Sequence, residues 1–311
     1  MSFHIETPLI YSHALSKLTE TKIYLKLECL QPSGSFKDRG MGYMCKNLKE
    51  NGAKYFVSSS GGNAGHSAAY IARMLNTPIK VIVPTSTKKN MIDLIKAQGA
   101  EVEVYGDNWN IADEKAQSIV NSGKKAAYIP PYDSPLLWKG HSSLVDEIVR
   151  TNIKPDAIVL SIGGGGLLCG VYKGLERHNW KDVKVIGVET EGTGSFNISY
   201  KANKLVRLDK IDSIATSLGA LEVTQEALKY KNEISTQSHV VTDLEALNAC
   251  KNFLNDHRIL VEPACGAALA LAYSIEKAKL LSKYSTVIIV VCGGSGVSLK
   301  YLSEWEKQMQ K

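Results

Sequence analysis

The segment SGSFKDRG, at residues 33–40, places a lysine among small and polar residues. Lys37 directly follows an aromatic residue, Phe36, and two glycines and two serines surround the pair. Such a segment is either a surface turn with a solvated lysine or a loop that presents a nucleophilic amine to a carbonyl compound. This stretch alone leaves both interpretations open.

Three glycine-rich turns each follow an apolar run: SSSGGNAG (58–65), SIGGGG (161–166) and CGGSG (292–296). Glycines allow close approach of the backbone, and the free N–H groups at a helix start bind anions. In the second turn, Leu168 and Cys169 stand where GxGxxG requires its last glycine, and no GxxxxGK[ST] motif occurs. This turn therefore predicts a site for a single phosphate monoester, and tight helix–sheet packing is the alternative.

The residues of the other two turns each have two interpretations. Ser60 and Asn63 are suited to capping a helix, and equally to binding a carboxylate or a phenolic oxygen. Cys292 ends a strongly apolar run, where it is either a buried hydrophobic residue or a ligand contact. No sequence feature ties a histidine to this cysteine, and we interpret His66 and His141 as capping or packing residues.

The elements that must position these residues alternate along the chain, which predicts βαβ units and a largely parallel α/β fold. In such sheets ligands bind beyond the carboxyl ends of the strands, where the glycine-rich turns lie. The expected strands are 23–28, 54–59, 79–84, 101–105, 157–162, 183–189 and 286–292. The expected helices are 63–76, 88–98, 111–121, 141–151, 166–178, 243–256 and 264–282.

Composition indicates a globular enzyme and excludes several other classes. Of the 311 residues 44% are hydrophobic and 22% are charged, and the net charge of +6 comes from scattered residues rather than from a basic run. We therefore expect no nucleic-acid partner. The opening MSFHIETP has no apolar signal segment, and no apolar stretch is long enough for a membrane span. Six cysteines without zinc-type spacing predict free thiols in a reducing cytoplasm.

A reactive lysine, a monophosphate site and an aromatic neighbour together match the needs of pyridoxal phosphate. From about Thr7 to the final helix, the chain resembles the fold-type II pyridoxal-phosphate enzymes of the serine/threonine dehydratase family, and most closely the animal-type L-serine dehydratases. The segments that carry this resemblance are QPSGSFK, SSSGGNAG, YIPPYDSPLLWKGHSSLV, LSIGGGGLLCGV, ILVEPACGAALA and VIIVVCGGS.

The resemblance implies a role for each matching residue. Lys37 would carry the cofactor as a Schiff base and act as the catalytic base, and Phe36 would pack on the pyridine ring. Asn63 would bind the ring hydroxyl, and Cys292 would face the pyridine nitrogen. The phosphate would be bound by Gly163, Gly164, Gly165, Gly166 and Leu167. The substrate carboxylate would be bound by Ser60, Gly61, Asn63 and Ala64. The backbone carbonyls of Gly163, Thr193, Leu218 and Ala220 would join Glu189 in a site for a monovalent cation such as K+.

The resemblance also implies a fold and an activity. The fold is the tryptophan synthase β-like architecture, with two open, mostly parallel sheets flanked by helices and the cofactor between two domains. We expect a large cofactor-binding domain at 1–34 plus 138–311 and a small domain at 35–137. The implied enzyme is a homodimeric lyase of amino-acid catabolism. It would convert L-serine to pyruvate and ammonia by β-elimination, and L-threonine to 2-oxobutyrate.

Three departures keep other activities open. Asp38 replaces the apolar residue common in serine dehydratases and is closer to threonine synthase and cysteine synthase usage, so a replacement enzyme is one alternative. Serine racemase is a second alternative, although Gly61 stands where that enzyme has its acid/base serine. Ser217 falls where the family tends to have a smaller residue, which affects the expected substrate preference. A pyridoxal-phosphate binding protein without catalysis is a third alternative, opposed by the intact set of site residues.

Overall fold

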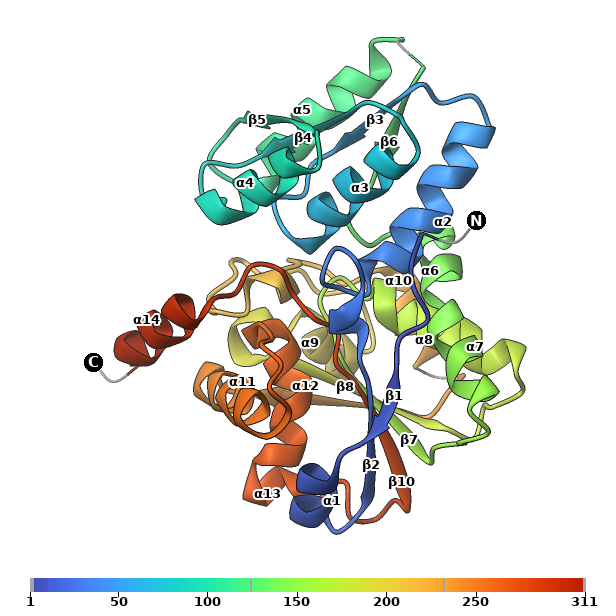
Figure 1. Ribbon diagram of the computed structural model, residues 1–311, viewed down its shortest axis with the longest axis vertical. Coiled ribbons are helices and arrows are strands. Elements are labelled where there is room, and N and C mark those ends of the chain that lie inside the picture. The colour runs from blue at the N-terminus through green and yellow to red at the C-terminus, as the bar shows by residue number, and fades with distance from the viewer. Residues whose placement is uncertain (1–2, 124, 232, 310–311) are drawn as a thin grey trace. The chain divides into compact units, whose positions relative to one another are not determined.

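The computed structural model describes residues 3–123, 125–231 and 233–309, and the chain divides into two compact units. Unit 1 comprises Gln31–His141 with the N-terminal residues up to Ile5, and unit 2 comprises Glu6–Leu30 and the chain from Ser142 onward. Each unit has its own sheet, with four strands in unit 1 and six in unit 2 (Figure 1). The assignment of these units as a small and a large cofactor-binding domain stays a prediction.

The sheet of unit 1 has the order β5-β4-β3-β6 and is parallel throughout. Helices α2, α3 and α4 pack side by side, while α5 packs on the strands. The apolar side chains of Val57, Ile82, Ala112 and Ala116 fill the space between α5 and the sheet. The elements of unit 1 are α2 (Lys37–Glu50), β3 (Tyr55–Ser58), α3 (Asn63–Met74), β4 (Ile79–Val83), α4 (Lys89–Ala97), β5 (Glu101–Val104), α5 (Trp109–Asn121), β6 (Ala126–Ile129) and α6 (Pro135–His141).

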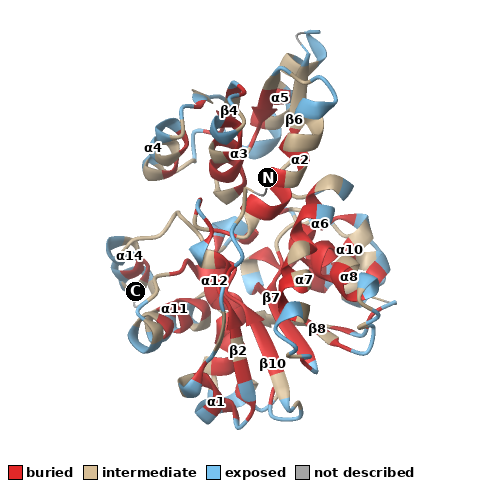
Figure 2. Ribbon diagram, turned by 45° about the vertical axis from the view of Figure 1, so that its right-hand side comes forward, coloured by how far each residue is buried: buried red, intermediate tan, exposed pale blue. Residues whose placement is uncertain are grey.

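The sheet of unit 2 has the order β1-β2-β10-β7-β8-β9, and only its edge strand β1 runs antiparallel. Helices α11 and α12 lie on one side of this sheet and α7 and α8 on the other (Figures 1 and 2). Its first elements are β1 (Leu9–Tyr11), α1 (His13–Thr19), β2 (Lys22–Lys26), α7 (Ser143–Arg150), β7 (Ala157–Ser161), α8 (Gly166–Arg177), β8 (Lys184–Thr190) and α9 (Ser195–Ala202). The remaining elements are α10 (Gln225–Tyr230), β9 (Thr236–Val241), α11 (Asp243–His257), α12 (Pro263–Tyr273), α13 (Ile275–Ala278), β10 (Thr286–Val290) and α14 (Leu299–Met309).

The central elements of unit 2 are apolar on every side. All five residues of β7 are buried, as are ten of the eleven residues of α12, and both elements are drawn largely in red in Figure 2. A parallel strand covered by helices on both faces needs a continuous apolar sequence, which AIVLS provides. The helix begins with Pro263, whose fixed φ suits a first helical position. These apolar elements support the polar turns at the strand ends.

The expected mostly parallel α/β architecture is confirmed, and every expected strand is present within a few residues. The main helix that sequence patterning misses is α2, which contains Gly40 and Gly42 and therefore has low intrinsic helix propensity. Strands β1, β6 and β9 were also not expected, because they are short or rich in alanine and polar residues. The single helix expected at 264–282 divides at Ser274, whose ψ of 122° is extended.

None of the helices built from the described residues combines the length and the apolar character that a membrane crossing requires. The six cysteines all lie within the described residues and form no disulfide with one another.

Candidate active site

Lys37 is the first residue of α2 and lies at the end of a tight turn. The N–H of Gly34 donates to the carbonyl of Gln31 at 2.7 Å, and Gly34 has a φ of 83°, which glycine adopts readily. The Nζ atom of Lys37 donates to the carbonyl oxygen of Pro131 at 2.6 Å and lies 5.1 Å from the centroid of the Phe36 ring. The amine is therefore held in one place, unlike that of a freely solvated lysine.

Asp38 holds this turn from inside the protein. Its side chain is fully buried, and one carboxylate oxygen accepts from the backbone N–H of Ser33 at 2.8 Å. The other oxygen accepts from the hydroxyl of Ser33 at 2.5 Å and from that of Ser67, in α3, at 2.6 Å. These bonds connect the turn before Lys37 to the neighbouring helix. The Asp38 carboxylate thus has a structural role within unit 1. Its presence at this position therefore does not require that the enzyme catalyse a replacement reaction.

The ring of Phe36 contacts the imidazole of His141, with centroids 4.9 Å apart and ring planes at 58°. His141 is completely buried, and among the described residues neither of its ring nitrogens has a hydrogen-bond partner. Burial and the nearby charges of Lys37, Arg39 and His4 lower the pKa of His141 well below its usual value. His141 is therefore a neutral packing residue behind Phe36, as expected from sequence.

The loop after β3 carries the residues expected to bind the substrate. Asn63 and Ala64 begin α3, and Ser60 and Gly61 precede them in the turn. The hydroxyl of Ser60 accepts from the N–H of Gly62 at 3.3 Å, so the turn is closed locally. No acidic residue lies in the first turn of α3, and the N–H groups of a helix start favour an anion. This end of α3 is therefore suited to a carboxylate.

The glycine-rich turn after β7 leads into α8 in unit 2. Gly165 has a φ of 90° and is the residue before the helix, so a side chain there would be strained. A Cβ on Gly163 would lie 3.1 Å from the backbone of Leu218, which shows how closely two backbone segments approach. The first turn of α8 also lacks acidic residues. The backbone N–H groups of Gly166 and Leu167 begin a twelve-residue helix, and such a helix start attracts a phosphate.

Cys292 follows β10 and is 8% exposed. A hydrogen bond with Cys265 and burial raise the pKa of the Cys292 thiol well above its usual value. The thiol therefore stays protonated at neutral pH. Beside it lies the buried carboxyl group of Glu262, which a Cβ on Gly294 would meet at 2.0 Å. Glu262 lies in the segment ILVEPACGAALA, where no local pattern marks it as a site residue.

Glu189 is fully buried near the end of β8. Its two carboxylate oxygens accept from the backbone N–H groups of Phe196 at 2.8 Å and Asn197 at 2.7 Å, at the start of α9. Burial raises the pKa of Glu189 to about 8, although these two bonds oppose the shift. Of the carbonyl groups expected to join it, those of Gly163 and Leu218 belong to segments in close contact.

The comparisons with known proteins agree along almost the entire chain. The sequence matches the family described as "Pyridoxal-phosphate dependent enzyme" over residues 1–293. The chain belongs to this family. It is 48% identical to the L-serine dehydratase/L-threonine deaminase of Bos taurus, with 98% of this chain and 96% of the relative aligned.

Solved structures of pyridoxal-phosphate enzymes share the fold. A fungal L-serine ammonia-lyase from Rhizomucor miehei has a TM-score of 0.93 and 37% identity, with 99% of both chains covered. Maize serine racemase has a TM-score of 0.89 at 23% identity, covering 99% of this chain and 93% of that one, and supports the fold alone. The expected fold-type II architecture is thereby confirmed.

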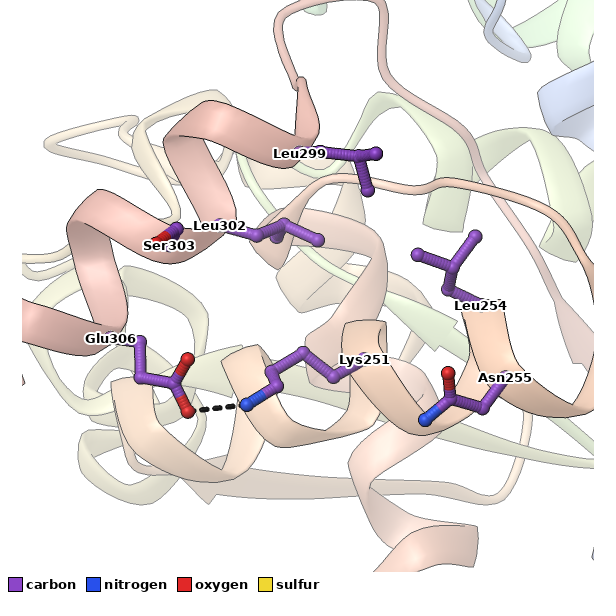
Figure 3. Close-up of a pocket in the computed structure, with 7 residues that line it drawn as sticks. All are labelled: Lys251, Leu254, Asn255, Leu299, Leu302, Ser303 and Glu306. Atoms are coloured by element: carbon purple, nitrogen blue, oxygen red, sulfur yellow. Dashed lines mark hydrogen bonds and ion pairs between the residues drawn. The ribbon is translucent and has the colours of Figure 1, made fainter.

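One hollow of this pyridoxal-phosphate enzyme lies apart from the predicted site residues. Figure 3 shows it between α11 and α14, with the side chains of Lys251 and Glu306 forming an ion pair at its edge. Its volume is about 210 Å³. It is lined by Lys251, Leu254, Asn255, Leu299, Leu302, Ser303 and Glu306. None of these residues belongs to the site that the sequence predicts.

Proposed function

We propose that this enzyme is an L-serine dehydratase that also deaminates L-threonine, with pyridoxal phosphate as cofactor. The 48% identity to the bovine L-serine dehydratase/L-threonine deaminase along nearly the whole chain carries the substrate assignment. The structural observation that supports the chemistry is the fixed amine of Lys37, hydrogen-bonded to Pro131 and beside the Phe36 ring.

The residues assigned to the site fit the chemical groups of pyridoxal phosphate. Lys37 supplies an amine for its aldehyde, and Phe36 supplies an apolar face for its ring. The start of α8, with Gly165 in a left-handed conformation and no acidic residue in the first turn, suits the phosphate. We assign Gly163, Gly164, Gly165, Gly166 and Leu167 to phosphate binding. Asn63 is assigned to the ring hydroxyl and Cys292 to the ring nitrogen.

The neutral thiol of Cys292 bears on the type of reaction. A thiol with a raised pKa can donate a hydrogen bond to the ring nitrogen but cannot serve as the anion that keeps this nitrogen protonated. We therefore expect limited electron withdrawal into the ring. This favours prompt loss of a β-substituent over transamination.

Bound pyridoxal phosphate supplies an electrophilic aldehyde and a conjugated ring, which together acidify the Cα–H bond of an amino acid. The start of α3 binds the substrate carboxylate through Ser60, Gly61, Asn63 and Ala64. The Nζ atom of Lys37 then accepts the Cα proton as a general base. The β-hydroxyl leaves as water by taking up the proton that Nζ accepted, and addition of water to the released enamine gives pyruvate and ammonia. From L-threonine the same steps give 2-oxobutyrate.

A monovalent cation such as K+ is part of this proposal. Glu189 and the backbone carbonyls of Gly163, Thr193, Leu218 and Ala220 are its proposed ligands. Two N–H groups of α9 already donate to the Glu189 carboxylate. The proposed cation and the start of α9 would therefore both stabilise the charged form of this carboxylate. Charge neutralisation of a fully buried carboxylate is the physical reason to place a cation there.

The proposal also places the enzyme in a reducing cytoplasm as a homodimer. The absence of disulfides among its six cysteines is compatible with such a compartment. Dimerisation rests on the family resemblance, and size-exclusion chromatography with light scattering would measure it.

The first test is an assay of purified enzyme with L-serine, L-threonine and D-serine, in which lactate dehydrogenase detects the keto acid. We expect release of pyruvate from L-serine and of 2-oxobutyrate from L-threonine, and the two rates rank the substrates. The Lys37→Ala variant should release neither, because it lacks the base. An enzyme that binds pyridoxal phosphate but releases no keto acid would contradict the proposal. Replacement chemistry with an activated serine ester would then be the next activity to assay.

A further inference from the structure

The loop after β4 reaches the glycine at the centre of the proposed carboxylate-binding loop. A Cβ built on Gly61 would lie 2.5 Å from Oγ1 and 2.7 Å from Cγ2 of Thr87. Carbon atoms that are not bonded rarely come closer than about 3.5 Å. The Thr87 side chain therefore occupies the space that a side chain at position 61 would need.

Strand order explains why two segments so far apart in sequence meet here. Strands β3 and β4 are parallel neighbours, with Ser58 paired to Val81. Parallel neighbours end at the same edge of a sheet, so the loops that follow them lie side by side. The first of these loops contains Gly61 and the second contains Thr87.

The β4 loop is held in place by backbone hydrogen bonds. The N–H of Thr87 donates to the carbonyl of Pro84 at 3.0 Å, and that of Thr85 donates to the carbonyl of Gly106 at 2.9 Å. Thr87 is half-buried, while Thr85 is exposed. The position of Thr87 next to Gly61 is therefore fixed by the backbone of the folded loop and does not depend on one flexible side chain.

We propose that Thr87 determines substrate specificity by setting the free space beside the loop that binds the amino-acid carboxylate. The proposal rests on the function proposed above. L-Threonine differs from L-serine by one methyl group, and Thr87 differs from serine by one methyl group. Removing the Cγ2 methyl from residue 87 would open a space of one methyl group beside Gly61, and one methyl group is also the difference between the two substrates.

The functional test compares kcat/KM for L-threonine and L-serine in three variants. Thr87→Ser removes the methyl group, Thr87→Val replaces the hydroxyl and keeps the shape, and Thr85→Ser is the matched control in the same loop. One methyl group in a binding pocket changes discrimination by about tenfold or more. We expect Thr87→Ser to raise the L-threonine to L-serine ratio by about this factor, while the other two variants retain the wild-type ratio. An unchanged ratio in Thr87→Ser, or a shift in Thr87→Val alone, would overturn the proposal.

A second test needs no catalysis. Gly61→Ala should lower the melting temperature of the enzyme, because the new Cβ overlaps Thr87. In a Thr87→Gly background the same substitution should cost less, so the two effects should not add. Additive shifts would show that the side chain of Thr87 does not fill this space, and would overturn the proposal. If wild-type enzyme releases no keto acid from either amino acid, the proposed function fails, while the melting temperatures still report on the contact.

Discussion

At the scale of single residues, several side chains that take no part in the reaction fix the turn and the aromatic ring next to Lys37. Asp38 binds Ser33 and Ser67, and His141 supports Phe36 from behind. A reactive group must be positioned within a fraction of an ångström, and contacts to the residues that neighbour the reactive group provide that precision. Their effect should therefore appear in cofactor binding as well as in stability.

Asp38 offers a direct test of this role. In Asp38→Asn the amide can turn its oxygen to the Ser33 N–H and its two N–H groups to the hydroxyls of Ser33 and Ser67, so the hydrogen bonds survive without the charge. Asp38→Leu leaves these donors buried without an acceptor. We expect Asp38→Leu to lose about 2–4 kcal/mol of unfolding free energy and Asp38→Asn much less.

Urea denaturation of both variants measures the stability effect, and the circular dichroism of the bound cofactor measures its orientation. The dichroism should weaken in Asp38→Leu and be retained in Asp38→Asn. Equal damage in the two variants would show that the negative charge, and not the hydrogen bonds, is what matters at this position.

Glu189 predicts a pH dependence of stability whose sign follows from its environment. Burial raises the folded-state pKa of this carboxyl from 4.5 to about 8. Between these values the folded protein keeps a proton that the unfolded chain has lost. Its stabilising contribution is therefore complete below pH 4.5. Between pH 4.5 and about 8 the free energy of unfolding falls by about 1.4 kcal/mol per pH unit, and above this range the contribution is lost.

Urea denaturation at several pH values, in tetramethylammonium chloride, would measure this slope, and Glu189→Gln should remove it. In potassium chloride the slope should be smaller, because a bound cation favours the charged carboxylate. The same slope in the two salts would contradict the proposed cation site.

At the scale of elements, α2 and α6 approach so closely that only glycine fits where they meet. A Cβ on Gly40 would lie 2.4 Å from Cε1 of His141, and a Cβ on Gly140 would lie 2.4 Å from the carbonyl oxygen of Arg39. The two glycines lower helix propensity but allow the helix that begins at Lys37 to pack against its neighbour. The packing of α2 against α6 thus offsets the lower helix propensity of the two glycines.

The contact between these helices predicts a specific pair of effects. Gly40→Ala should destabilise the protein by about 1–3 kcal/mol, because the imidazole of His141 is buried and has little room to move. Adding His141→Ala should recover part of this loss. The control is Gly194→Ala, since Gly194 has a φ of −71° and a Cβ there meets no atom closer than 3.7 Å.

Thermal unfolding of the single and double variants measures this coupling. If Gly40→Ala is no worse than Gly194→Ala, the close approach of α2 and α6 is not what requires glycine.

At the scale of the whole molecule, cofactor binding should stabilise the fold. Residues assigned to pyridoxal phosphate are far apart in the sequence, from Lys37 to Cys292. A ligand that binds only the folded state adds about 2.7 kcal/mol of stability at one hundred times its dissociation constant. Removal of the cofactor should therefore lower the melting temperature of the enzyme.

Differential scanning calorimetry of the enzyme with and without pyridoxal phosphate would measure this shift. Lys37→Ala should show a smaller shift, because it keeps the phosphate contacts and loses the amine. A shift of equal size in wild type and Lys37→Ala would exclude Lys37 from cofactor binding.

The sequence by itself determined the parallel α/β class, the strands that end in glycine-rich turns, and the family to which the chain belongs. Apolar runs such as AIVLS and the glycines that follow them are local features, and local features can be recognised from the sequence alone. Lys37 and Gly163–Gly166 were recognisable for the same reason. Helix α2 was not, because its glycines argue against a helix until its packing partner is known.

Only the tertiary structure decided which residues stand behind the reactive ones. Asp38 is separated from Ser67 by 29 positions, and Gly61 from Thr87 by 26, so neither contact leaves a local pattern. The buried carboxyl of Glu262 beside the Cys292 turn depends likewise on how α12 packs near the end of β10. Contacts of this kind arise from strand order and helix packing, which place distant segments at one sheet edge.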